Sequence, residues 1–141
     1  MIPSLHVHAP VLGINPDRGV LVPPSDPTSV GWWRQGARPG ARRGAAVLTG
    51  HTVSTGGGVF DDLDRLRSGD RVRVTTAGKT LVFVVDRART YAKRSLARHA
   101  ARLFGQSGPG RLVLVTCDDW DGEVYRSNFV ATAGLRTVRE R

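Results

Sequence analysis

The feature that most constrains this chain is a series of short apolar runs, each separated from the next by a turn signal rich in Gly, Pro, Asn or Asp. Alternation of apolar with polar positions and the many β-branched residues in these runs predict β-strands. The predicted strands cover residues 5–7, 11–14, 45–48, 72–76, 81–85, 112–116 and 129–132. A hairpin over residues 71–87, turning at Ala77-Gly78, is the clearest single element. Many short strands with this punctuation indicate an all-β sandwich or barrel.

Two segments have the spacing of short helices. In residues 59–67, apolar side chains recur at i, i+3 and i+6, and Asp61 and Asp62 lie where they would cap the first turn. Residues 95–104 form the second predicted helix. A chain of 141 residues is the size of one ordinary domain, so we expect residues 1–141 to fold as a single unit.

The chain is strongly basic, with 21 Lys and Arg against 12 Asp and Glu. Such a balance raises the question of nucleic acid or of an anionic surface. Lys79 and Lys93 are the lysines, and the arginines are scattered along the chain without forming one basic run. We therefore expect no nucleic-acid partner.

Cys117 is the one cysteine of the chain, which excludes an internal disulfide and a multi-cysteine zinc site. It follows the apolar run 112–116 and precedes Asp118, Asp119 and Trp120. A nucleophile typically occupies such a point, where a buried strand meets a polar loop. A core cysteine acting as a small apolar filler is the alternative.

His51 and Arg126 are the residues that complete a mechanism for Cys117. His51 ends the apolar run 45–48 and its Thr-Gly continuation, and Arg126 opens the strand after Cys117. A thiol with a pKa of about 8.5 is only slightly ionised at neutral pH, so an imidazole is needed to stabilise the thiolate and to protonate a leaving amine. An arginine supplies fixed N–H donors for an oxyanion. We predict a cysteine acyl-transfer enzyme without a metal.

The order of three motifs resembles that of the sortase family. These motifs are Thr49-Gly50-His51, Leu114-Val115-Thr116-Cys117 and the arginine that opens the next strand. Residues 2–5, 22–32 and 66–72 are also similar, so the resemblance covers nearly the whole chain, and it is closest to the actinobacterial sortases grouped as class E or class F. It implies a closed eight-stranded β-barrel with one or two short helices.

The resemblance also implies a function. A sortase would cleave an LPXTG-type or LAXTG-type C-terminal sorting signal after its threonine, hold the acyl group as a Cys117 thioester and transfer it to a peptidoglycan-linked amine. Such an enzyme needs no cofactor. We expect a monomer that acts at the extracellular face of the cell membrane or in the cell wall, with an anchor ahead of Met1 in the full-length protein.

Carried over to this sequence, the family pattern gives three further site residues. Thr116, Tyr91 and Leu96 are expected to bind substrate, with residues 90–96 in the loop that forms the wall of the signal groove. The loop over residues 118–125 is shorter and more acidic than in related sortases, which affects the expected signal preference. Two alternatives stay open: a cysteine hydrolase on the same barrel, and a noncatalytic basic β-barrel binding module with an inert Cys117.

Overall fold

The computed structural model describes residues 1–5, 7–15, 23–53, 56–120 and 125–140, without the side chains of residues 93–94, 97, 117–120, 125–126 and 140. This part of the chain contains seven strands, one α-helix and two 3₁₀ turns. The elements are η1 (Pro3–Leu5), β1 (Val11–Ile14), β2 (Val30–Trp33), β3 (Ala45–Thr49), η2 (Leu63–Arg65), β4 (Arg71–Thr76), β5 (Lys79–Ala92), α1 (Lys93–Phe104), β6 (Arg111–Trp120) and β7 (Tyr125–Glu140).

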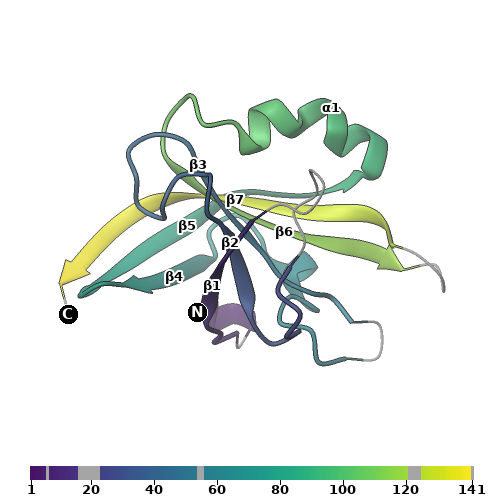
Figure 1. Ribbon diagram of the computed structural model, residues 1–141, viewed down its shortest axis with the longest axis horizontal. Coiled ribbons are helices and arrows are strands. Elements are labelled where there is room, and N and C mark those ends of the chain that lie inside the picture. Colours follow the sequence, from purple (N-terminus) through teal and green to yellow (C-terminus); the bar gives the residue numbers. More distant parts are fainter. Residues whose placement is uncertain (6, 16–22, 54–55, 121–124, 141) are drawn as a thin grey trace.

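The seven strands form one sheet in the order β1-β2-β3-β6-β7-β5-β4. β1 is parallel to β2 and β3 is parallel to β6, whereas the other neighbouring pairs are antiparallel. The sheet curls into a half-barrel, and α1 lies across one of its faces (Figure 1). The all-β expectation is confirmed in the coarser sense that the described residues are mostly β with one helix. They form seven strands in a half-barrel, so the expected eight strands and closed barrel are not confirmed.

β6 is buried on both of its faces. Leu112 and Leu114 belong to the main apolar core inside the curl of the sheet. Val113 packs in a second core cluster, which contains Leu103 of α1. A strand covered on both faces has no solvent-facing positions to fill with polar residues, which explains the continuous apolar run before Cys117.

Several predicted elements are confirmed. The hairpin over residues 71–87 is present as β4 and β5, with its turn between Thr76 and Lys79. The predicted helix 95–104 is α1, which begins two residues earlier. No helix among the described ranges is long and apolar enough to cross a membrane.

Other assignments were wrong. The described residues of the predicted strand over residues 5–7 do not form one, because Leu5 ends the 3₁₀ turn η1 and Val7 makes only an isolated bridge with Ile2; residue 6 lies outside the described residues. Strand β2 was missed, since it follows a proline-rich segment. Residues 90–96 are not a loop: they form the end of β5 and the first turn of α1.

The predicted helix over residues 59–67 is also wrong, because the segment forms only the 3₁₀ turn η2. Phe60, Leu63 and Leu66 are all buried, at 2%, 0% and 0% exposure. Their backbone bonds run from Leu63 N to Phe60 O and from Leu66 N to Leu63 O, over three residues. A spacing of i, i+3 and i+6 puts side chains on one line when there are three residues per turn, so it fits this tighter geometry.

Candidate functional site

The residues that precede His51 and Cys117 are joined directly. β3 and β6 are parallel neighbours in register, with Thr49 opposite Val115. One residue later, the Thr116 hydroxyl donates a hydrogen bond of 2.8 Å to the Gly50 carbonyl, and both residues are buried. His51 and Cys117 therefore follow this link side by side, on the chain just beyond β3 and within β6. The expectation that Cys117 ends its strand and opens a loop over residues 118–125 was wrong, because β6 continues past it to Trp120 and stays paired with β7.

Strand β7 brings Arg126 to the same end on the other side of β6. The antiparallel register sets Cys117 opposite Asn128 and Asp118 opposite Ser127. Arg126 immediately precedes Ser127 in β7. The side chains of Cys117 and Arg126 lie outside the described part of the structure. The backbone positions of the three candidate catalytic residues are thus on β6, on its neighbour β7 and just beyond its neighbour β3.

His51 is half-buried, and its ring is fixed by the proline-rich segment that precedes β2. Nε2 of His51 lies 2.6 Å from the carbonyl oxygen of Pro24. Since a carbonyl can only accept a hydrogen bond, Nε2 must carry a proton, and this contact assigns the tautomer of the neutral ring. Nδ1 is then the nitrogen that can exchange a proton with a reacting group.

The segment that contains Pro24 is held by Asp26. Its carboxylate accepts hydrogen bonds from the backbone and hydroxyl of Thr28, at 2.9 and 2.7 Å, and from the Ser29 hydroxyl at 3.2 Å. The hydrogen bond from the Thr28 hydroxyl is the main cause that lowers the pKa of Asp26, followed by the bond from the Thr28 backbone. This turn fixes the chain next to the carbonyl that orients His51.

Asp61 closes the loop that follows His51, a role that the sequence did not reveal. Its carboxylate accepts backbone hydrogen bonds from Val53 at 2.6 Å and from Gly58 at 3.0 Å. The prediction that Asp61 and Asp62 cap a helix was wrong for Asp61. At Asp62, which is the N-cap of η2, no side-chain capping bond forms. The run of glycines before Asp61 could have suggested a loop held by a carboxylate.

Glycine is required at position 50 for a steric reason. A Cβ built there would lie 2.6 Å from Cγ1 of Val59 and 2.9 Å from the ring of Phe60. The backbone nitrogen of Phe60 donates to the carbonyl of His51 at 3.0 Å, so this segment cannot move away freely. Close packing therefore explains the glycine between Thr49 and His51.

Asn128 is a residue of the candidate site that the sequence analysis did not single out. It is half-buried, stands opposite Cys117 on β7, and its Nδ2 is 3.4 Å from the carbonyl of Thr116. On the other side of β7, the register pairs it with Tyr91 of β5. Tyr91, Asn128 and Cys117 thus form one row across three strands.

Two of the three expected substrate contacts, Tyr91 of β5 and Leu96 of α1, belong to the apolar cluster between α1 and the sheet. Tyr91 is 2% exposed, and its ring lies 5.5 Å from that of His99 and 5.2 Å from the Arg89 guanidinium carbon. Its hydroxyl is buried without a hydrogen-bond partner among the described atoms. Leu96 is half-buried against the same cluster. Their contact with substrate stays a prediction.

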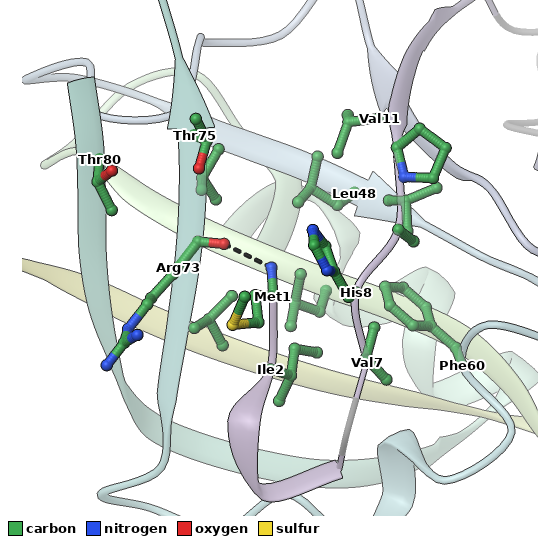
Figure 2. A pocket seen from close by; sticks show the side chains of 16 residues that line it. Met1, Ile2, Val7, His8, Val11, Leu48, Phe60, Arg73, Thr75 and Thr80 are labelled. Carbon is green, nitrogen blue, oxygen red and sulfur yellow. Dashed lines mark hydrogen bonds between the residues drawn. The ribbon is translucent and has the colours of Figure 1, made fainter. Parts of the chain in front are cut away.

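A cavity of about 500 Å³ lies elsewhere, between the N-terminal segment and β4 (Figure 2). His8 points into it, and the amino group of Met1 donates to the Arg73 carbonyl at 2.7 Å beside it. Burial, and then the charge of Arg73, lowers the pKa of this amino group. Neither His51 nor Thr116 lines the cavity, so it is separate from the candidate site.

Comparison with known structures finds the same fold in several enzymes. Sortase E1 from Streptomyces coelicolor, solved with a tripeptide in its active site, superposes with a TM-score of 0.76 at 25% identity, over 100% of this chain and 88% of that one. Sortase C-1 from Actinomyces oris gives 0.74 at 27% identity, over 97% and 72%. Sortase A from Listeria monocytogenes gives 0.76 at 18% identity, over 99% and 86%.

Sequence comparison gives the family itself. The curated protein sequences contain no match to this chain. The model of the sortase domain, however, matches residues 1–136, which is nearly the whole length. Together with the shared fold, this match shows that the chain belongs to the sortase family.

Proposed function

We propose that this chain is a cysteine transpeptidase that cleaves an LPXTG-type or LAXTG-type sorting signal after threonine and transfers the acyl group to a peptidoglycan-linked amine. Sortases are transpeptidases that act on sorting-signal peptides, and the family is associated with the cell surface. We propose that residues 1–141 act as one catalytic domain, related to class E or class F, at the extracellular face of the membrane.

The hydrogen bond from Thr116 to Gly50 is the observation that most supports this proposal. It joins the two residues that directly precede the proposed nucleophile and the proposed acid and base. A catalytic acid or base must come within hydrogen-bond reach of the reacting atoms, about 2.6–3.2 Å. Two neighbouring strands joined by a buried bond are a rigid base for such an arrangement.

In the proposed acylation step, the Cys117 thiolate attacks the carbonyl carbon of the signal's threonine. A C–S bond forms, and the carbonyl π electrons move to the oxygen, whose negative charge Arg126 stabilises with its N–H donors. Collapse of this intermediate breaks the C–N bond to the next residue. Because Nε2 of His51 is committed to Pro24, Nδ1 supplies the proton to the leaving amine.

In the proposed transfer step, the incoming amine attacks the thioester carbonyl. His51, now neutral at Nδ1, accepts the proton that the amine loses. The new C–N bond forms, the C–S bond breaks, and the Cys117 thiolate is regenerated. The acyl group thus passes from one amine to another without net oxidation or reduction.

The test is to incubate the protein with LPXTG and LAXTG peptides, with and without an added amine. We expect an acyl-enzyme by mass spectrometry, amine-dependent product, and loss of both in Cys117→Ala. Full cleavage by Cys117→Ala would overturn the proposal. Hydrolysis without amine transfer would identify a cysteine hydrolase instead, and slow alkylation of Cys117 with no acyl-enzyme would identify a binding module.

A further inference from the structure

Four arginines line one pocket on the outer face of the sheet, at the end of β7 far from Arg126. The pocket has a volume of about 300 Å³ and is lined by Arg71, Arg73, Thr80, Val82, Arg136, Thr137 and Arg139. Roughly 40 Å of strand separates Arg139 from Arg126, at about 3.3 Å per residue. We name this feature the arginine pocket, and it is distinct from the candidate catalytic end.

The register explains how the arginine pocket is built. β5 lies between β4 and β7, and Val82 of β5 faces Arg73 on one side and Thr137 on the other. Val82 is only 7% exposed although it shares the outer face with the exposed Arg73. The long stems of flanking arginines can cover such an apolar position while their charged ends reach solvent. β5 is therefore the floor, and β4 and β7 carry the charged walls.

The charges of the arginine pocket have no compensating partner among the described side chains. No acidic residue lines it, and the guanidinium groups of its four arginines make no hydrogen bond or ion pair with the described residues. Strands that flank a common neighbour are about 10 Å apart, which is near the Debye length in about 0.1 M salt. Salt therefore screens the charges on the two walls only in part, and they still repel one another. An anion bound between them would relieve that repulsion.

We propose that the arginine pocket binds a phosphoryl group. A phosphoryl group carries a charge of about −1.5 to −2 and three acceptor oxygens, which matches several guanidinium forks better than a single carboxylate does. The hydroxyls of Thr80 and Thr137 add two neutral donors at the same pocket. A soluble phosphate ester and a phospholipid headgroup both present this chemistry. This proposal does not rest on the proposed transpeptidase activity.

The test uses the whole chain and two matched double variants. Arg73→Gln with Arg139→Gln removes two charges from opposite walls of the pocket. Arg42→Gln with Arg98→Gln removes the same net charge from exposed positions outside it. Far-UV circular dichroism checks that each variant is folded. Inorganic phosphate is titrated at constant ionic strength, with chloride and acetate as comparison anions, and the backbone amide shifts of Val82 and Thr137 are followed by NMR.

We expect saturable shifts with phosphate that exceed those with acetate, and a loss of affinity of more than about tenfold in the pocket variant alone, because two charge-assisted donors are removed. Co-sedimentation with phosphatidylglycerol vesicles, against phosphatidylcholine vesicles, distinguishes the sources. Vesicle binding that the pocket variant loses identifies a lipid headgroup, and phosphate binding alone identifies a soluble ester. Absence of both, or an equal loss in the two double variants, overturns the proposal.

Discussion

Substitution of Thr116 by valine tests most directly the link between β6 and the residue that follows β3. Valine keeps the β-branched shape, so the change removes the hydroxyl that donates 2.8 Å to the Gly50 carbonyl and little else. Thr116 is 4% exposed, and water cannot readily replace the lost donor. A buried carbonyl left without its partner costs about 1–3 kcal/mol, so we expect the free energy of unfolding to fall by that amount.

Thr132→Val is the matched control for this substitution. The Thr132 hydroxyl also donates one bond, 2.7 Å long, but its acceptor is the carboxylate of the exposed Asp86. Water can solvate that carboxylate after the change, so we expect a loss of at most about 1 kcal/mol. The free energy of unfolding of both variants is to be measured by urea denaturation followed by circular dichroism.

The activity of the same variants tests the positional part of the argument. If the hydrogen bond from Thr116 to Gly50 positions His51 next to Cys117, kcat should fall in Thr116→Val. It should recover in Thr116→Ser, which keeps the hydroxyl, and stay unchanged in Thr132→Val. Small displacements of catalytic groups can reduce rates strongly. The reasoning is refuted if Thr116→Val and Thr132→Val lose equal stability, or if Thr116→Val keeps the stability and kcat of the parent protein.

Three further predictions concern the surroundings of His51. Asp61→Ala should lose about 1.5–3 kcal/mol of stability and reduce cleavage, because two backbone donors lose a charged acceptor. The control Asp62→Ala removes only an exposed 3.8 Å ion pair with Arg65, so it should lower the free energy of unfolding by at most about 1 kcal/mol. Equal losses of stability in Asp61→Ala and Asp62→Ala, measured by urea unfolding, would contradict this account. Gly50→Ala should lose about 1–3 kcal/mol by overpacking, whereas Gly134→Ala, which meets nothing within 4 Å, should change thermal stability little; a neutral Gly50→Ala would show that Val59 and Phe60 yield. Because the pKa of Asp26 is lowered in the folded protein, its ionised carboxylate stabilises the fold above the ordinary pKa of 3.8, and this stabilisation is lost as pH falls through the folded pKa. Thr28→Val should raise the pKa of Asp26 in an NMR titration. An unchanged pKa would exclude the Thr28 hydroxyl bond as the main cause of the shift.

The predictions from sequence succeeded where a local pattern and the tertiary environment agree. The alternation in β4, with exposed Arg71 and Arg73 beside buried Val72, is decided by the one core face of that strand. The hairpin β4–β5 and the helix α1 were predicted for the same reason. The spacing of Phe60, Leu63 and Leu66, by contrast, identified three core residues but not the backbone geometry, because Asp61 closes a loop with donors that local spacing does not show.

The sequence by itself determined the composition of the candidate site: one cysteine, a histidine after an apolar strand and an arginine after the next turn, in the order typical of sortases. Only the tertiary structure decided which strands are neighbours. Parallel pairing of β3 with β6 joins Thr116 to Gly50, and antiparallel pairing adds Asn128 opposite Cys117. It also gathers arginines from β4 and β7 around β5. Such contacts join residues far apart in the chain, so they depend on sheet register, which no local run of residues specifies.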